Sequence, residues 1–289
     1  EPDQYVNMGT LPSGAEFHVN KLATECDLLI CEGFIEPHFF AGFSGGRKSV
    51  LPGVCSRETV MANHCSEFIA SPYARTGVLE GNPLHKDMLY AARTAKLAYI
   101  VNVVIDEKKQ AIYAVAGDVE AAHKAGCEFL SGLCRVKPIY ADIAISTNGG
   151  YPLDQNVYQS FKGMTAAEAT VREGGVIIML SSCTDGHGGE DLYRELADEP
   201  DDKKAADKIL ARGRNQTVPD QWQAQILLRI LSRARVIFVS EAPDEMIRDM
   251  HMIPAHSIGE ALKMAKEMLG NSEPTITAVP DGISVMVVE

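Results

Sequence analysis

The sequence predicts an α/β protein that is built from two α/β domains with mixed or parallel sheets. Apolar runs of strand length alternate with helix-like segments along the chain, which is the order expected of βαβ units. The chain has 289 residues, more than one typical domain, and its 46% hydrophobic and 23% charged residues are an ordinary globular composition. The segment 134–138 interrupts the alternation, so we expect an N-terminal domain at 1–136 and a C-terminal domain at 137–289.

The first domain contains a short apolar run at 27–31, which we interpret as a buried parallel strand. The loop that begins at Pro37 would then lie at the carboxyl end of a strand, where ligands bind in open α/β sheets. Ser56 is a candidate N-cap for a helix that contains His64. The further elements expected in this domain are helices at 57–69, 83–95 and 118–133 and a strand at 97–105.

The second domain begins with a strand at 141–146, a loop at 148–154, a helix at 155–172 and a strand at 175–180. This βαβ order implies a parallel pair of strands joined by a right-handed crossover. The remaining elements are expected as helices at 201–212, 221–233 and 258–269 and as strands at 236–240, 275–279 and 284–288.

The charge and the cysteines narrow the class of protein. A formal net charge of −12, from 27 basic and 39 acidic residues, argues against a nucleic-acid partner. The seven cysteines are scattered singly, which is typical of a reduced, cytoplasmic chain. No apolar run approaches the ~18 residues of a membrane helix. The chain opens with Glu1 rather than Met, so we expect its true start to lie upstream.

The segment from His38 to Lys48 is the most informative one. Its composition predicts a phosphate cradle, because a glycine-rich turn after a strand can leave backbone N–H groups for an anion. A P-loop nearly fits, but Arg47 occupies the position of a required glycine, so nucleotide hydrolysis is disfavoured. The candidate cofactor-binding residues in this turn are Gly42, Ser44, Gly45, Gly46 and Arg47.

Two histidines flank this segment. His38 lies in a loop, where an imidazole suits general acid/base chemistry, although a purely structural hydrogen bond is the alternative. His64 has no H-x-x-x-H or C-x-x-C companion, so it is either a packed helical residue or a metal ligand whose other partners come from elsewhere.

Taken together, these residues resemble the nickel-pincer nucleotide dependent lactate racemase family of 2-hydroxyacid racemases and epimerases. The resemblance runs from about Gly9 to Trp222. It rests on the run 36–48, on His64 sixteen residues after Lys48, on the run 158–164, and on Trp222.

The resemblance implies a cofactor, the nickel-pincer nucleotide, in which a pyridinium mononucleotide holds nickel through two sulfurs and a ring carbon. Lys48 matches the lysine to which the family attaches this cofactor covalently. His64 matches the histidine that completes the nickel coordination, so one protein ligand suffices. The glycine turn and Arg47 would suit the cofactor's phosphate.

The resemblance also implies the chemistry. The α-hydrogen of a 2-hydroxy acid is poorly acidic, so hydride transfer to the cofactor avoids a carbanion, and His38 matches the catalytic histidine that takes the hydroxyl proton. Gln159 and Lys162 lie three residues apart on the predicted helix and present donors on one face. The expected substrate-binding residues are Tyr158, Gln159, Lys162 and Trp222, with the active site in the cleft between the domains.

One departure and two alternatives remain open. The family's second catalytic histidine, with an aspartate and an arginine, would lie upstream of Glu1, and nothing around His18 matches that role. The alternatives are a phosphate-loop enzyme that uses Lys48 electrostatically without nickel, and a non-catalytic cofactor-binding relative. The expected partners are a small 2-hydroxy acid and the proteins that synthesise the cofactor and insert nickel.

Overall fold

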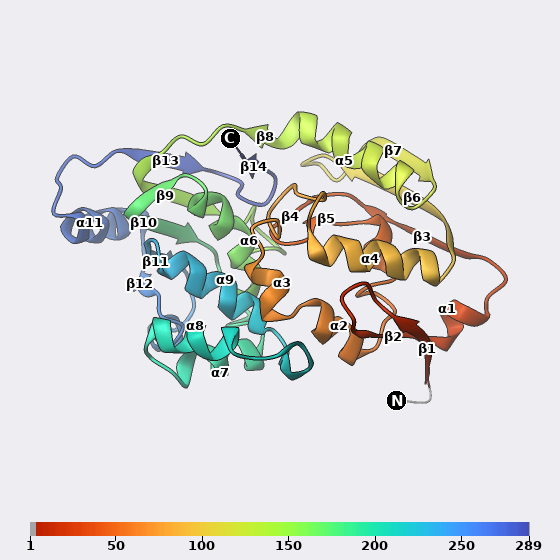
Figure 1. Cartoon of the computed structure of the whole chain (residues 1–289). Helices are drawn as coiled ribbons and strands as arrows, with labels where there is room; N and C mark the ends of the chain where they lie inside the picture. Colours follow the sequence, from red (N-terminus) through yellow and green to blue (C-terminus); the bar gives the residue numbers. More distant parts are fainter. Residues whose placement is uncertain (1–3, 289) are drawn as a thin grey trace. The chain divides into compact units, whose positions relative to one another are not determined.

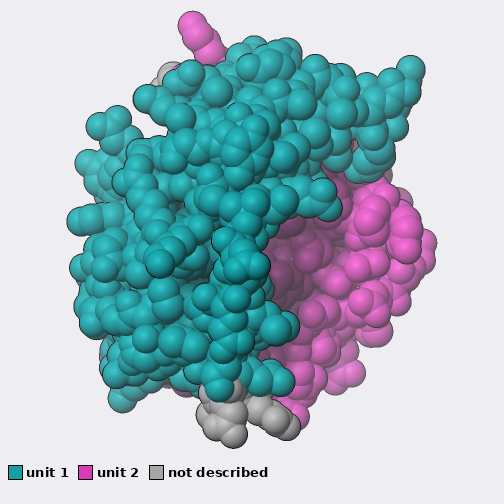
Figure 2. Space-filling model, turned by 90° about the vertical axis from the view of Figure 1, so that its right-hand side faces the viewer, with its two compact units in different colours: residues 1–134, 213–217 teal, residues 135–212, 218–289 magenta. Residues whose placement is uncertain are grey.

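A computed structural model describes residues 4–288 of the chain. It divides into two compact units (Figures 1 and 2). Unit 1 comprises residues 1–134 and 213–217, and unit 2 comprises residues 135–212 and 218–289. The short stretch 213–217 therefore joins the first unit although its neighbours in sequence belong to the second, which the sequence did not predict.

Unit 1 is built around a three-stranded mixed sheet in the order β3-β6-β7, in which β3 and β6 are parallel and β6 and β7 antiparallel. Its strands are β1 (Tyr5–Thr10), β2 (Glu16–Asn20), β3 (Leu29–Phe34), β4 (Pro37–His38), β5 (Gly42–Phe43), β6 (Leu97–Ile105) and β7 (Ala111–Gly117). Its helices are α1 (Lys21–Glu25), η2 (Gly46–Ser49), α2 (Arg57–Asn63), α3 (Ser66–Ala70), α4 (Pro83–Thr94), α5 (Ala121–Cys134) and η3 (Arg214–Gln216).

The strand expected at 27–31 exists as β3 and is parallel to its neighbour, but the expectation that it is buried was wrong. Ile30 is 57% exposed and Phe34 45% exposed. On the adjacent strand β6, the register partner of Ile30 is Tyr99, which is also exposed, as is Val101. The opposite face carries Ile100, which is fully buried. An apolar run shows that one face of a strand packs, and it does not show that both do.

Unit 2 contains a five-stranded parallel sheet in the order β12-β11-β10-β9-β13. Its strands are β8 (Arg135–Val136), β9 (Ala141–Thr147), β10 (Val171–Leu180), β11 (Arg235–Val239), β12 (Ile253–Ala255), β13 (Ile276–Val279) and β14 (Met286–Val287). Its helices are α6 (Val157–Glu168), α7 (Glu190–Ala197), α8 (Asp202–Leu210), α9 (Gln221–Leu231), α10 (Asp244–Asp249) and α11 (Ile258–Leu269). The mixed and parallel sheets confirm the predicted α/β class.

Helices cover both faces of this parallel sheet (Figure 1). Val176 and Ile178 of β10 pack with Ala261 and Ala265 of α11 on one face. On the other face α6 approaches closely, because a Cβ on Gly163 would lie 3.0 Å from the Met179 side chain and 2.3 Å from Thr147 O. Gly163 thus allows α6 to lie directly on the carboxyl end of β9. The predicted βαβ unit with parallel strands is confirmed.

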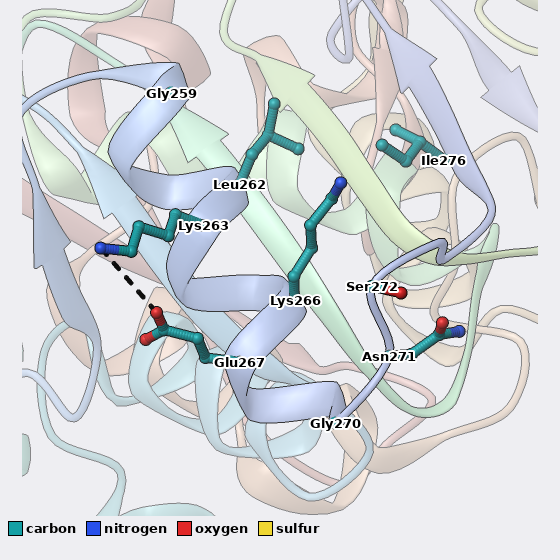
Figure 3. A pocket seen from close by; sticks show the side chains of 9 residues that line it. All are labelled: Gly259, Leu262, Lys263, Lys266, Glu267, Gly270, Asn271, Ser272 and Ile276. Atoms are coloured by element: carbon teal, nitrogen blue, oxygen red, sulfur yellow. Dashed lines mark ion pairs between the residues drawn. The ribbon is translucent and has the colours of Figure 1, made fainter.

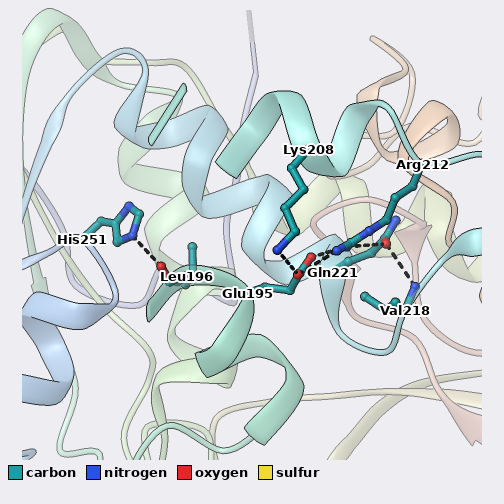
Figure 4. A network of polar contacts seen from close by, with 7 residues as sticks. All are labelled: Glu195, Leu196, Lys208, Arg212, Val218, Gln221 and His251. Atoms are coloured by element: carbon teal, nitrogen blue, oxygen red, sulfur yellow. Dashed lines mark hydrogen bonds and ion pairs between the residues drawn. The ribbon is translucent and has the colours of Figure 1, made fainter. Parts of the chain in front are cut away.

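A polar network, centred on the buried Glu195 and Gln221, joins α7, α8 and the start of α9 (Figure 4). Arg212 donates to both carboxylate oxygens of Glu195, and its Nη1 also donates to Gln221 Oε1 at 3.1 Å. Lys208 lies 3.3 Å from the same carboxylate. Burial alone would raise the pKa of Glu195, but the two cations prevail and lower it. Because Gln221 Oε1 also accepts from Val218 N at 3.1 Å, the network determines how α9 begins.

A further stabilising contact holds the stretch 213–217 within unit 1. Arg214 of η3 donates to Glu67 at 3.1 Å, and its guanidinium lies 4.5 Å from the centre of the Phe68 ring. Both partners belong to α3, which directly follows His64. Within the described residues, no helix is long and apolar enough to cross a membrane.

Candidate active site

The glycine turn of unit 1 follows β3. Two of its glycines lie so close to neighbouring atoms that no side chain would fit at their positions. Gly42 has a φ of +79°, and a Cβ there would lie 2.3 Å from the carbonyl oxygen of Val78. A Cβ on Gly46, whose φ is +53°, would lie 2.8 Å from the His123 ring. These two glycines are therefore required by backbone conformation and by close packing.

Arg47 is the central support of this turn. Its side chain is fully buried, with Nη2 donating to Ala41 O at 2.7 Å and Nη1 to Phe43 O at 2.8 Å. Nε donates to His85 Nδ1 at 3.0 Å, and Nη1 lies 3.1 Å from His123 Nε2. The expectation that Arg47 suits a cofactor phosphate does not agree with this geometry, because the guanidinium is engaged by carbonyls and imidazoles of the protein. Its role here is to hold the turn closed.

Three backbone N–H groups of the expected cradle have acceptors within the protein. Ser44 N donates to Glu36 O at 2.9 Å, Gly46 N to Asn102 Oδ1 at 2.8 Å, and Lys48 N to Gly45 O at 3.2 Å. The Ser44 hydroxyl donates to Phe34 O at 3.0 Å. Amide groups with protein acceptors are not open to a phosphate, so the turn resembles a rigid support for Lys48 more than an anion-binding loop.

Burial and the Arg47 charge keep the two supporting histidines neutral. Both effects lower the pKa of His85 to about 4 and that of His123 to about 3. A neutral His85 can accept from Arg47 Nε, and His123 Nε2 donates to Ser44 O at 2.8 Å. Neither histidine was predicted to contribute, and they lie 38 and 76 residues from Arg47, so no local pattern could have revealed them.

Three of the predicted site residues, His38, Lys48 and His64, lie around the ring of Phe40. The His38 ring centre lies 4.5 Å from that of Phe40, the His64 ring centre 5.5 Å, and Lys48 Nζ 5.9 Å. Phe39 stacks on the other side of His38 at 5.0 Å. Phe40 is buried, and its ring lies between the candidate catalytic base, tether and metal ligand.

His38 is half-buried in the short β4–β5 hairpin rather than in an irregular loop. Ala41 N donates to its Nδ1 at 3.3 Å, which favours the neutral tautomer with the proton on Nε2. The stacked Phe39 and the edge of Phe40 further orient the ring.

His64 has the properties of a neutral metal ligand. The predicted helix 57–69 is broken here, and His64 is the C-cap of α2 rather than a residue within a continuous helix. Its Nδ1 donates to Val60 O at 2.9 Å, which places the lone pair on Nε2. Burial, with a smaller contribution from the Lys48 charge, lowers its pKa to about 4. The ring is 5% exposed and neutral at physiological pH.

The part of the chain that the structure describes forms no metal site from protein ligands alone. Across residues 4–288, no three His, Cys, Asp or Glu side chains are grouped so that they could hold a metal ion. A metal bound by His64 would therefore take its remaining ligands from a non-protein group. The buried neutral imidazole and the nearby Lys48 fit such a group.

Unit 2 carries the predicted substrate-binding residues on α6 and α9. Tyr158, Gln159 and Lys162 lie on α6, which begins at the carboxyl edge of the parallel sheet. Trp222 on α9 donates from Nε1 to the Tyr158 hydroxyl at 3.3 Å. Gln159 Oε1 is buried, and among the described residues it has no hydrogen-bond partner. A buried amide oxygen of this kind calls for a ligand or an ordered water.

A pocket of about 700 Å³ lies elsewhere in unit 2, on α11, the loop after it, and Ile276 of β13 (Figure 3). Its rim carries Lys266 and the exposed ion pair of Lys263 and Glu267, whose atoms are 4.0 Å apart. None of the predicted site residues lines it, and its polar groups are exposed helix-surface side chains. We assign it no role in the site.

With the geometry described, comparison with known proteins gives the class. Residues 136–287 match the Lactate racemase C-terminal domain, and residues 1–77 match the Lactate racemase N-terminal domain. The chain belongs to the lactate racemase family.

Individual relatives agree with this assignment. The chain is 57% identical to a lactate racemase of Thermoanaerobacterium thermosaccharolyticum and 58% identical to one of Lactiplantibacillus plantarum, in each case over 98% of this chain and 66% of the relative. It thus spans just under two thirds of the length of these curated relatives.

Two solved structures are similar in fold. The lactate racemase apoprotein from T. thermosaccharolyticum superposes over all of this chain and 69% of its own, with a TM-score of 0.98 and 56% identity. A Thermotoga maritima protein superposes over all of this chain and 76% of its own, with a TM-score of 0.70 and 20% identity, which shows a shared fold only.

Proposed function

We propose that this chain acts in the racemisation or epimerisation of a lactate-like 2-hydroxy acid and carries a nickel-pincer nucleotide attached to Lys48. Support comes from the family membership and from one observation in particular. A lysine and a buried neutral histidine lie around the same aromatic ring, in a chain whose described residues form no group of three or more His, Cys, Asp or Glu side chains that could hold a metal ion. That combination suits a metal whose other ligands arrive with a tethered cofactor.

Lys48 would hold the cofactor covalently, and His64 would coordinate nickel through Nε2. The Val60 carbonyl fixes the tautomer that this requires, and burial keeps the ring unprotonated. The glycine turn and Arg47 would act indirectly, by holding the backbone of Lys48 in place. When bound, the cofactor supplies an electrophilic carbon that can take up a hydride and return it.

The protein's own groups would handle the substrate and its proton. His38 would accept the hydroxyl proton as the α-hydrogen leaves, which yields a planar 2-keto acid without a carbanion. Lys162 would bind the substrate carboxylate, and Gln159, whose buried Oε1 has no partner among the described residues, would accept a hydrogen bond from the substrate. Tyr158 and Trp222 would shape the rest of the binding site. Return of hydrogen to the opposite face gives the mirror product.

We favour the tethered cofactor over the phosphate-loop alternative, in which Lys48 acts electrostatically without nickel, because the amides of Ser44, Gly46 and Lys48 and the Arg47 guanidinium are engaged by acceptors within the protein. A non-catalytic relative that only carries the cofactor is separated from the racemase by an activity assay. The cofactor-synthesis and nickel-insertion proteins are the partners that this proposal requires.

The test is co-production of the chain with cofactor-making enzymes, followed by mass spectrometry and nickel analysis. We expect added mass on the Lys48 peptide, no added mass in Lys48→Ala, and an unchanged adduct in Lys109→Ala, a matched exposed lysine in a turn of unit 1. His64→Ala should retain the adduct but lose nickel. An unmodified Lys48 peptide in protein without bound nickel would overturn the proposal.

An activity assay distinguishes a racemase from a relative that only binds the cofactor. Loaded protein should interconvert the enantiomers of at least one member of a panel of 2-hydroxy acids. His38→Ala should keep the adduct and nickel while losing about 10²-fold or more in rate, as expected for removal of a general acid/base. The assay uses the full-length protein, so that the residues upstream of Glu1 are present, and loaded full-length protein without turnover on the whole panel would favour the carrier.

A further inference from the structure

Asp220 occupies an unfavourable conformation at the start of α9. Its φ of +60° and ψ of 1° place it in the left-handed region, which in the described part of the chain only a few residues other than glycine adopt. It also stands at the N-cap position, where an aspartate ordinarily accepts a hydrogen bond from the helix, yet its side chain makes no such bond. A residue that forgoes its cap and accepts backbone strain points to another use of its side chain.

The side chain is directed to Tyr158 instead. Burial and, next in importance, the charge of the neighbouring Asp220 carboxylate raise the pKa of Tyr158, whose hydroxyl accepts from Trp222 Nε1 at 3.3 Å. Gln223, one residue further along α9, donates from Nε2 to the Tyr158 carbonyl at 3.2 Å. Three residues from the first turn of α9, Asp220, Trp222 and Gln223, thus surround Tyr158.

The surroundings leave room for this contact and keep it in place. A Cβ on Gly189 would lie 3.1 Å from Asp220 Oδ2 and 3.5 Å from the Tyr158 ring, so the glycine lets both side chains approach the start of α7. The next residue, Gln221, is fully buried and is anchored by Arg212 in the network of Figure 4. Asp220 therefore projects from a rigid helix start, as a positioning group should.

We propose that Asp220 is a positioning residue of the substrate site: it fixes the Tyr158 hydroxyl, and through it the Trp222 indole, in the orientation that binds the 2-hydroxy acid. The part that concerns substrate rests on the proposed function. The part that concerns Tyr158 and Trp222 does not, and it can be tested on the chain without cofactor.

Trp222 is the only tryptophan in the sequence, so its fluorescence reports this contact directly. Asp220→Gly removes the carboxylate and suits the left-handed backbone, so the variant should fold. Asp220→Asn keeps an acceptor for the Tyr158 hydroxyl in a residue that tolerates the same conformation. Lys109→Gly is the matched control, since Lys109 has a φ of +61° in a turn of unit 1.

In Asp220→Gly we expect red-shifted Trp222 emission and about twofold stronger quenching by acrylamide, because a loosened indole meets more water. Asp220→Asn should recover most of the wild-type signal, and Lys109→Gly should match wild type. In cofactor-loaded protein, we expect Asp220→Gly to raise KM for the hydroxy acid about 10-fold and to leave kcat within about threefold of wild type. This pattern indicates weaker substrate binding rather than a slower chemical step. Tyr158→Phe should show the same effects, and the double variant no more than either single one.

Wild-type emission and quenching in Asp220→Gly would overturn the proposal, whatever the activity. If emission changes as expected and no hydroxy acid is bound or converted by wild type, the contact stands and the proposed function fails. An equal change of KM in Asp220→Gly and Lys109→Gly would also refute a positioning role, since it would show a general effect of glycine.

Discussion

Unit 1 should lose stability steeply below neutral pH, because three of its histidines are buried in the neutral form. The pKa of His64 and of His85 is lowered to about 4, and that of His123 to about 3, in each case mainly by burial. The unfolded chain protonates histidine near pH 6.5, so in the window between about 6.5 and 4 it binds protons that the folded protein excludes. Acid therefore favours unfolding.

The magnitude follows from the shifts. At pH 5 each of the three histidines should lower the free energy of unfolding by about 2 kcal/mol relative to pH 8, or about 6 kcal/mol in total. Asp87 acts in the opposite direction, since burial raises the pKa of its carboxyl and its protonation in the folded state offsets part of the loss. A change of several kcal/mol is comparable to the whole stability of an ordinary domain.

The assay is urea unfolding of nickel-free protein at a series of pH values. Unfolding is monitored by chemical labelling of the buried thiols of Cys55 and Cys127, which lie in unit 1. Tryptophan fluorescence would not serve, because Trp222 lies in unit 2. His85→Gln keeps an acceptor for Arg47 and should remove about 2 kcal/mol of the pH dependence. Ile69→Val is the control: it should shift the free energy by about 1 kcal/mol at every pH. A free energy that changes by less than about 1 kcal/mol between pH 8 and 5 would refute the reasoning.

Two further predictions concern the glycine turn, and both are checked by the same unfolding assay. Gly42→Ala should cost about 3 kcal/mol or more through strain and the clash with Val78 O, whereas Gly14→Ala, also in unit 1 and with a φ of +87° but no atom within 4 Å, should cost only about 1 kcal/mol. Equal losses would show that packing is not the cause. Arg47→Lys should cost about 3–5 kcal/mol, since an ammonium cannot satisfy the carbonyls and imidazoles that now surround the guanidinium. Wild-type stability in Arg47→Lys would contradict the supporting role given to Arg47.

The parts of the fold that were predicted from sequence are those with a local signal. The parallel pair around α6 was predicted because apolar runs of strand length flank a helical segment. Gln159 and Lys162 share a face of α6 because their spacing depends only on helical geometry. The apolar run at 27–31 predicted a strand correctly, but it carried no information on whether a second layer covers β3.

The features that were not predicted depend on contacts between distant segments. Arg47 looked like a free cation in the sequence, and only the closure of the turn onto His85 and His123 shows that it is enclosed. The break at His64 was missed because the residues around it continue a helical pattern. Asp220 was not singled out from the sequence, because its contact with Tyr158 joins residues more than sixty positions apart.

The return of residues 213–217 to unit 1 bears on how the chain is divided in the laboratory and in evolution. A fragment that ends at Cys134 lacks η3, so it would expose Phe68 and leave Glu67 without the Arg214 partner, directly after the histidine assigned to nickel. A fragment that begins at Arg135 would contain residues 213–217 without Glu67 and Phe68, against which Arg214 packs. Unit 1 is therefore not one contiguous stretch of coding sequence, and recombination or truncation at the boundary between the two matched domains would not deliver either unit whole.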